Sequence, residues 1–417
     1  MTANARQIEH CRVCGSPNLT SALALGEQYL TGVFPRSLDE TITRGPLELV
    51  RCDGEQACGL VQLRHSYESS EVYGTSYGYR SGLNQSMVDH LRSKVGDLQR
   101  FVGGLTAQDL VLDIGSNDGT LLGCYPEAVT RIGIDPTAAK FREFYKPGIE
   151  IIPDFFSAEA FRSRLRTRKA RIVTSIAMFY DLEAPQSFVE QVASVLADDG
   201  IWHFEQSYLP AMLAANAYDT VCHEHLEYYC LKQVKWMMDR GGLKLIDVEL
   251  NDTNGGSFAV TVAKADSPLP SNSSVIERML RGEEKAGLDT PIPYAQFRER
   301  VWKHREDLLA LLTKLRDEGA NVLGYGASTK GNVILQFCGI TASLLPCIAE
   351  VNTDKFGRFT PGTHIPIVSE AEAHAMKPDY FLVMPWHFRE NLIQREAAFL
   401  KRGGKMIFPL PNIEIVG

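Results

Sequence analysis

The chain has 417 residues, of which 44% are hydrophobic and 23% are charged, and its formal net charge is -8. This length suits two or three domains with their own cores. No apolar run approaches the roughly 18 residues of a membrane-spanning helix, and the first residues lack the apolar segment of a signal peptide. We therefore expect a cytoplasmic protein. The acidic balance argues against nucleic acid or an anionic membrane as the main partner, and we expect a monomer or weak dimer.

The cysteines cluster near the N-terminus. Of the nine in the chain, Cys11, Cys14, Cys52 and Cys58 fall in the first 58 residues. Both Cys14 and Cys58 precede a glycine, and a Cys-x-x-Cys-Gly turn directs two thiolates at one tetrahedral ion. We predict a zinc site, with free thiols as the alternative. Four thiolates leave no open position, so this zinc would be structural.

The next segment is rich in tyrosine and glycine. Residues 71–82 include Tyr77 and Tyr79, which suit either a loop over a ligand or a surface turn. A helical pattern follows, with apolar residues at Met87, Leu91, Val95 and Leu98.

Five short apolar runs then alternate with crossover-length segments, which predicts a parallel sheet with helices on both faces. Ligands of such sheets bind beyond the carboxyl ends of the strands. The predicted strands are 110–113, 131–135, 149–152, 171–176 and 200–205.

Pro, Ser and Asn become frequent over 264–293, which predicts a linker. An amphipathic helix is expected over 294–318, and a second α/β unit begins near Asn321. We therefore predict three domains, at 1–68, 69–284 and 285–417.

The first predicted strand of the sheet ends in a motif that suits a nucleoside ligand without phosphate. Its pattern is DxGxxxG rather than the GxGxxG of dinucleotide sites, and an acid stands where a phosphate would be repelled. S-adenosylmethionine fits this description; a nicotinamide site or a structural glycine turn are the alternatives. Asp135 ends the next strand and can accept two ribose hydroxyls, and the third strand is followed by an acid and an aromatic face for adenine. The expected cofactor residues are Asp113, Gly115, Asn117, Asp118, Gly119, Asp135, Asp154 and Phe155.

The stretch CHEHLEYY, residues 222–229, concentrates titratable groups beyond the fifth strand. If it is extended, His223 and His225 point the same way and could bind a metal, although no third ligand is evident nearby. A pair of structural histidines is a second interpretation. The third is acid–base chemistry, with Glu224 or Glu227 orienting an imidazole. Methyl transfer to carbon needs a carbanion, which a base can make next to a ketone.

A strand-to-helix loop over 324–332 offers backbone N–H groups, two hydroxyls and an ammonium group. It suits a diphosphate, with a plain turn as the alternative. Its candidate substrate residues are Ser328, Thr329, Lys330 and Asn332.

In this order, the cysteine segment, VLDIGSNDGTLL, CHEHLEYY, NDTNGGSFAVTV, GYGASTKGN and RFTPGTHIPI resemble the nucleotide-linked keto-sugar C-methyltransferases, over almost the whole chain. The resemblance implies C-methylation of a TDP-linked 3-keto-6-deoxysugar, with His225 as base. It also implies that tyrosines of the 77–79 loop line the site and that the C-terminal unit helps to bind the nucleotide diphosphate.

The chain departs from that family at two positions. Cys222 stands where the family often has Tyr, and the segment 176–182 lacks a histidine that the family often carries there. Tyr180 or Tyr228 could supply a phenol from another position.

The sequence thus predicts a class I S-adenosylmethionine methyltransferase core of Rossmann-like α/β type, a small zinc module before it and a second Rossmann-like domain after it. The expected substrate is a nucleotide-diphosphate sugar, most simply methylated at carbon. The alternatives are O-methylation of such a sugar, a protein that binds it without catalysis, and a nicotinamide oxidoreductase that uses the 324–331 loop. The expected catalytic residues are His225, Glu224, His223, Tyr77 and Tyr79.

Overall fold

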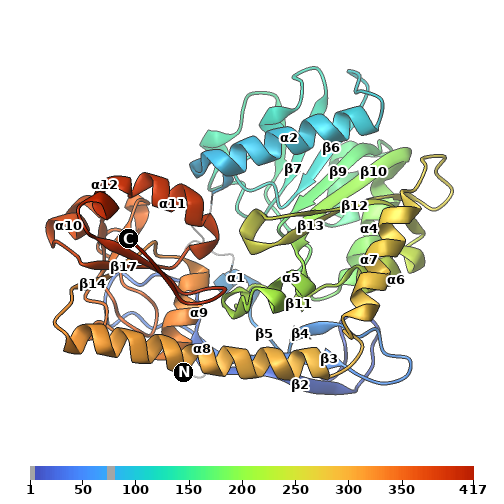
Figure 1. The fold of residues 1–417 in the computed structure, drawn as a ribbon. Helices are drawn as coiled ribbons and strands as arrows, with labels where there is room; N and C mark the ends of the chain where they lie inside the picture. The colour runs from blue at the N-terminus through green and yellow to red at the C-terminus, as the bar shows by residue number, and fades with distance from the viewer. Residues whose placement is uncertain (1–4, 73–79) are drawn as a thin grey trace.

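The computed structural model describes residues 5–72 and 80–417, so Tyr77 and Tyr79 lie outside the described residues. Three larger sheets and one short strand pair make up the fold (Figure 1). No helix in the described part of the chain has both the length and the apolar character to cross a bilayer.

The central sheet has seven strands in the order β12-β13-β10-β9-β6-β7-β8. Strands β6 to β10 run parallel to one another, whereas β13 runs antiparallel to both β10 and β12. This arrangement confirms the predicted class I core. The strands are β6 (Leu110–Ile114), β7 (Thr130–Ile134), β8 (Ile149–Ile152), β9 (Ala170–Ile176), β10 (Leu196–Ser207), β12 (Leu243–Asn251) and β13 (Ser257–Lys264).

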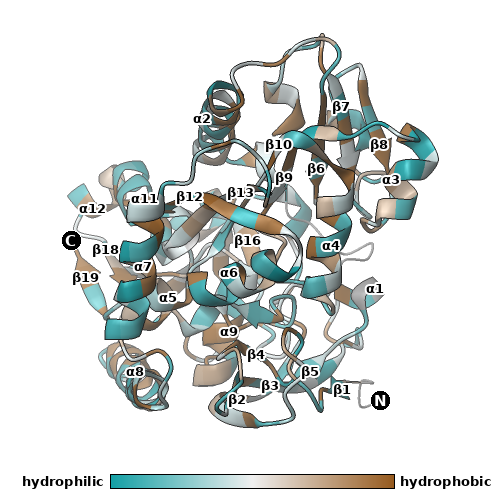
Figure 2. Ribbon diagram, turned by 90° about the vertical axis from the view of Figure 1, so that its right-hand side faces the viewer, coloured by the Kyte–Doolittle hydropathy of each residue, from teal (hydrophilic) through white to brown (hydrophobic). Residues whose placement is uncertain are grey.

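Helices cover both faces of this sheet because its strands are apolar on both sides. On one face, α2 (Gln85–Phe101) packs Leu91 and Val95 against Val111 and Ile172. The opposite face is covered by α3 (Ala158–Leu165), α4 (Pro185–Val195) and α6 (Leu231–Arg240). In Figure 2 the central strands are mostly brown, whereas the outer helix α7 (Ser273–Lys285) is largely teal.

The N-terminal module is a four-stranded sheet in the order β11-β4-β3-β2. Its edge strand β11 (Glu227–Tyr228) comes from the CHEHLEYY stretch, so that stretch joins the zinc module to the methyltransferase core. The other strands are β2 (Leu19–Tyr29), β3 (Arg44–Cys52) and β4 (Val61–Leu63), and β1 (Arg6–Gln7) pairs with β5 (His65–Ser66) beside them.

The C-terminal unit is a six-stranded sheet in the order β16-β15-β14-β17-β18-β19, parallel except for β19. It confirms the predicted second α/β unit. Its strands are β14 (Val322–Tyr325), β15 (Ile348–Glu350), β16 (Ile367–Ser369), β17 (Tyr380–Val383), β18 (Lys405–Phe408) and β19 (Glu414–Val416). Its helices are α9 (Thr329–Cys338), α10 (Glu370–Ala375), α11 (Arg389–Arg395) and α12 (Ala397–Lys401).

The long helix α8 (Ile292–Asp317) lies under both the C-terminal unit and the N-terminal sheet (Figure 1), and matches the predicted amphipathic helix. Its Phe297 and Leu308 belong to one apolar cluster that also includes Leu23 of β2 and Ile334 of α9. The predicted linker over 264–293 is wrong in part, because α7 occupies its centre. The short helices α1 (Ser69–Val72) and α5 (Leu209–Ala214) complete the fold.

Candidate functional site

The four predicted cysteines come together in the N-terminal module. Their sulfur atoms all lie within 4.8 Å of one another, with 3.6 Å between Cys11 and Cys58 and 3.4 Å between Cys14 and Cys52. A tetrahedral zinc with bonds of about 2.3 Å needs sulfurs about 3.8 Å apart, so this set fits the ion. Cys52 and Cys58 have five residues between them, yet both sulfurs join the cluster, because Cys52 ends β3 and the loop after it brings Cys58 back toward Cys52.

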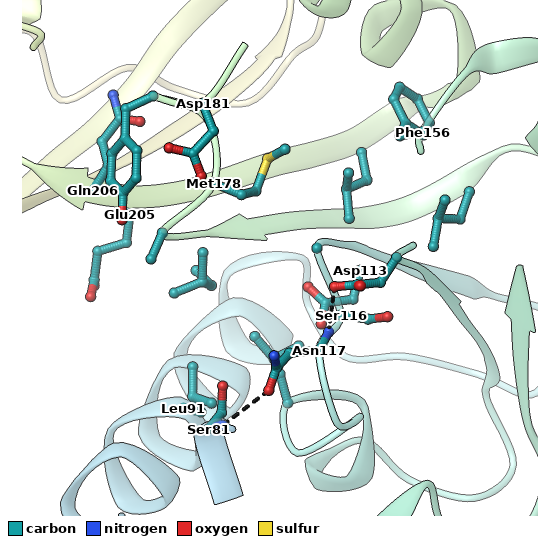
Figure 3. A pocket seen from close by; sticks show the side chains of 18 of the residues that line it. Ser81, Leu91, Asp113, Ser116, Asn117, Phe156, Met178, Asp181, Glu205 and Gln206 are labelled. Atoms are coloured by element: carbon teal, nitrogen blue, oxygen red, sulfur yellow. Dashed lines mark hydrogen bonds between the residues drawn. The ribbon is translucent and has the colours of Figure 1, made fainter. Parts of the chain in front are cut away.

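A separate cavity opens at the carboxyl ends of β6, β7, β9 and β10 (Figure 3). Asp113, at the end of β6, accepts a hydrogen bond from the Thr174 hydroxyl at 2.6 Å. Burial raises the pKa of Asp113 to about 7; the Thr174 hydrogen bond opposes this rise, and the nearby Asp135 charge adds to it. Gly115 follows with a φ of +74°, and a Cβ there would lie 3.0 Å from the Met178 side chain.

Asp135 lies at the end of β7 and also lines the cavity. One carboxylate oxygen accepts the backbone N–H of Asn117 at 2.8 Å, and the other accepts the backbone N–H and hydroxyl of Thr137, both at 2.6 Å. These donors hold the carboxylate in place at the cavity wall.

Phe155 and Phe156 line the cavity, as the aromatic face expected after β8. Phe155 is 53% exposed, and Phe156 packs against Phe188 with ring centroids 5.3 Å apart. Asp154 is exposed and does not line the cavity; its carboxylate accepts the backbone N–H of Phe155 at 2.7 Å.

The polar residues of the glycine turn after β6 differ in position: Asn117 faces the cavity and Asp118 does not. Asn117 lines the cavity, and its side-chain oxygen accepts the Ser81 backbone N–H at 3.0 Å. Asp118 lies outside the lining and accepts the Gly82 backbone N–H at 2.9 Å, so it anchors the segment before α2. Gly119, also outside, has a φ of +75° and a position where a Cβ would lie 2.5 Å from the Tyr145 ring.

The sequence reasoning missed Glu205 and Gln206, which end β10 and line the cavity. Glu205 is buried, and its carboxylate oxygens lie 2.7 Å from His90 Nε2 and 2.9 Å from Asn251 Nδ2. Although burial disfavours its charge, the hydrogen bond from His90 and the charges of His90 and Lys94 lower the pKa of Glu205. Its position at a strand end, like that of Asp113 and Asp135, is the signal that could have found it.

The described lining of this cavity is acidic. Asp113, Asp135, Asp181 and Glu205 contribute to it, and none of the described residues that line it is Lys, Arg or His. Such a lining suits a cationic ligand and disfavours a diphosphate. The cavity therefore fits S-adenosylmethionine.

The CHEHLEYY stretch lies beside this cavity. The backbone N–H groups of Leu226 and Glu227 donate to the Tyr180 carbonyl at 2.8 and 3.0 Å, and Tyr180 itself lines the cavity. The His225 ring packs on the Tyr180 ring with centroids 4.3 Å apart.

The tautomer of His225 follows from its partner. Nδ1 lies 3.0 Å from the Thr220 carbonyl, which can only accept, so Nδ1 carries the proton and Nε2 keeps a lone pair. Burial and, after it, the positive charge of Lys330 lower the pKa of His225 to about 3, although the Thr220 hydrogen bond opposes both. His225 is therefore neutral at pH 7.

His223 does not share this environment. The chain turns here, with the His225 N–H donating to the Cys222 carbonyl at 3.2 Å, so the stretch is not extended and does not place the two histidines in register. His223 is 2% exposed and packs edge-on against Tyr67, at 4.7 Å between centroids. Burial lowers its pKa to about 4. Within the described residues, the cysteine cluster is the group found with metal-ligand geometry.

The Glu224 carboxyl faces the N-terminal module and α9. A Cβ on Gly32 would lie 2.2 Å from Glu224 Oε1 and 3.7 Å from Thr329 Oγ1. Burial raises the pKa of Glu224, and its hydrogen bond with Cys222 opposes the rise. The carboxyl thus lies where the three parts of the chain meet.

The 324–332 loop reaches the same place. Lys330 is close enough for its charge to act on His225, Asp219 and His387. Ser328 caps α9 by accepting the Gly331 N–H at 3.0 Å, and Asn332 donates to the Thr31 carbonyl at 2.7 Å. The structure thus brings Thr329 and Lys330 to CHEHLEYY, while Ser328 and Asn332 make structural contacts.

Family models match three successive segments of the chain. They are "Putative zinc binding domain" over residues 11–73, "Methyltransferase domain" over 88–248 and "C-methyltransferase C-terminal domain" over 252–411. These matches agree with the predicted cofactors, S-adenosylmethionine and a structural zinc ion.

Among characterised proteins, C-methyltransferase NovU of Streptomyces niveus is 32% identical over 416 residues, which cover 99% of this chain and 97% of NovU. Solved structures give weaker likenesses. Mitomycin 7-O-methyltransferase MmcR has 16% identity and a TM-score of 0.34 over 44% of this chain and 55% of its own. A methyltransferase from Clostridium acetobutylicum has 13% identity and a TM-score of 0.33 over 42% of this chain and 92% of its own. Scores this low add no argument. The full-length likeness to NovU, together with the three segments, shows that the chain belongs to the C-methyltransferase family with an N-terminal zinc-binding segment.

Proposed function

We propose that this protein methylates a carbon atom of a nucleotide-linked keto-deoxysugar, through an enolate that His225 generates. When bound, S-adenosylmethionine supplies an electrophilic methyl group. A carbon acceptor must present an electron pair to it, and removing a proton beside a carbonyl is the accessible route.

The observation that carries this proposal is the state of His225. Its Nδ1–H is committed to Thr220, so Nε2 is an acceptor, and its ring packs on Tyr180 at the wall of the acidic cavity. In the proposed step the acceptor C–H bond breaks, the proton goes to Nε2 and the electron pair moves to the carbonyl oxygen. This carbon would then be the nucleophile for the donor's methyl group, whose bond to sulfur would break and leave S-adenosylhomocysteine.

The donor would be held by the cavity residues already described. Asp135 would accept the ribose hydroxyls, Phe155 and Phe156 would contact adenine, and Gly115 would let the backbone approach the sulfonium end. The acidic lining would favour the cation over its neutral product.

Lys330 would couple the nucleotide to the base. Its charge depresses the pKa of His225 in the free protein. A diphosphate bound at Lys330 and the start of α9 would neutralise that charge and raise the basicity of His225. The base would therefore become stronger when substrate binds.

The test is mass spectrometry of the protein with S-adenosylmethionine and a panel of TDP-, GDP- and CDP-linked 3-keto- and 4-keto-deoxysugars in deuterated water. We expect one added methyl group at a carbon that also exchanges its hydrogen for deuterium in unreacted substrate. A product methylated on oxygen would refute the enolate mechanism. Binding of S-adenosylmethionine without any product from the panel would favour a protein that binds without catalysis.

A further inference from the structure

Gln206 is a buried amide without a partner in the described structure. Its side chain lines the cavity, the residue is 2% exposed, and neither Nε2 nor Oε1 has a hydrogen-bond partner. Leaving a buried polar group unpaired costs about 1–3 kcal/mol, so both atoms call for a ligand.

The strand geometry says which part of the cavity this amide serves. Successive side chains of a strand point to opposite faces. Glu205 points to the face covered by α2, where it meets His90 and Lys94. Gln206 therefore points to the other face, as do Trp202 and Phe204.

That other face is the one on which CHEHLEYY packs. Phe204 contacts Phe179 with centroids 5.0 Å apart, and Phe179 stacks on Tyr229 at 5.4 Å. Tyr180, whose ring packs against the His225 ring, belongs to the same apolar cluster. Figure 3 shows Asp181, Glu205 and Gln206 on one side of the cavity, across from Asp113, Ser116 and Asn117.

Gln206 lies far from the part of the cavity where the donor's ribose is expected. Asp135 follows β7 and Gln206 ends β10, which is three strands away in the order β10-β9-β6-β7. At about 4.8 Å per strand this is about 14 Å. The amide therefore lies beyond the ribose, on the side of the cavity where CHEHLEYY packs.

We propose that Gln206 binds the acceptor directly, with Nε2–H donating to the carbonyl oxygen and Oε1 accepting from a hydroxyl on the adjoining carbon. A keto sugar carries this pair, and one amide has a donor and an acceptor to match it. As the C–H bond breaks and the proton passes to His225, negative charge grows on the oxygen that Gln206 contacts. Gln206 is thus the donor that stabilises the enolate. The inference rests on the proposed function.

The test uses Gln206→Leu and Gln206→Glu, with Gln394→Leu on the exposed face of α11 as the control. The rate to measure is deuterium uptake at the acceptor carbon with S-adenosylhomocysteine bound, using the keto sugar that the unmodified protein methylates. Losing one oxyanion donor typically slows a reaction about 10²- to 10³-fold. We expect that loss in Gln206→Leu, no change in Gln394→Leu, and S-adenosylhomocysteine affinity within about twofold of the original.

Two further readouts separate this role from a structural one. Gln206→Glu should be as slow at pH 8 but recover as the pH falls, because a protonated carboxyl donates again. Gln206→Leu should not lower the melting temperature, since an unpaired buried amide is replaced by an apolar group.

Full exchange activity in Gln206→Leu would overturn the role of Gln206 and leave the proposed function intact. A tenfold loss of S-adenosylhomocysteine affinity would assign the amide to the donor and also overturn it. If the unmodified protein methylates no keto sugar of the panel, the proposed function fails and the inference falls with it.

Discussion

Replacing His225 by Asn removes the proposed base while keeping its anchor. The Asn amide nitrogen can take the place of Nδ1 and still donate to the Thr220 carbonyl, which lies 3.0 Å from Nδ1 in the structure. What disappears is Nε2, the acceptor. General-base catalysis typically contributes 10²- to 10⁴-fold, which is about 2.7–5.4 kcal/mol of activation free energy.

The assay is deuterium exchange at the acceptor carbon with S-adenosylhomocysteine bound, because it isolates proton removal from methyl transfer. We expect His225→Asn to lose exchange by that factor with donor affinity unchanged. His225→Gln is the matched variant: its amide reaches the Nε2 position but leaves the Thr220 carbonyl, so it should lose exchange and stability together.

The pH profile gives an independent check. His225 has a pKa lowered to about 3, so it stays neutral as pH falls from 8 to 5. Because His225 does not become protonated over that range, we expect no fall in kcat/KM that is due to His225 between pH 8 and pH 5. Exchange that survives in His225→Asn, or an acid limb near pH 6.5 that disappears in this variant, would refute the reasoning.

Further predictions follow from other parts of the site. Lys330→Met should raise the pKa of His225, since a positive charge is removed. NMR titration of the His225 ring measures this pKa, with Lys330→Arg as the control that keeps the charge, and an unchanged value in Lys330→Met would contradict the charge effect. Asp135→Asn should raise the Kd of S-adenosylmethionine at least tenfold in calorimetry, whereas Asp154→Asn, outside the cavity, should not. Cys52→Ser should lower zinc content, measured by metal analysis, and the melting temperature; full zinc occupancy would argue against this ligand set. His223 has a pKa of about 4 in the folded protein and about 6.5 in the unfolded chain. Between these pH values the ring takes up a proton on unfolding, so the free energy of unfolding decreases as the pH falls. His223→Phe should thus gain about 2 kcal/mol relative to the original between pH 7 and 5 in urea unfolding, and a constant difference would refute the buried neutral state.

Where a motif is local, the sequence was sufficient. The acids and glycines at the ends of β6 and β7 follow strands that are recognisable by their apolar runs, so Asp113, Gly115 and Asp135 could be assigned to one edge of a sheet. Turn geometry likewise grouped Cys11 with Cys14. The Pro- and Ser-rich composition after residue 264 misled, because it marks only the loop before α7 and gives no signal of the helix that follows.

Tertiary contacts decided the rest. Asp118 and Asn332 looked like ligand residues, yet each serves a structural contact, with Gly82 and Thr31, that no short pattern announces. CHEHLEYY was visible as a string of titratable groups, but only the turn at residues 222–225 and the pairing of β11 with β4 separate His223 from His225. Strand ends are fixed by local periodicity, which sequence carries. The charge that acts on a side chain can come from far along the chain, as Lys330 of α9 acts on His225 about 100 residues before it, and only the folded chain brings the two together.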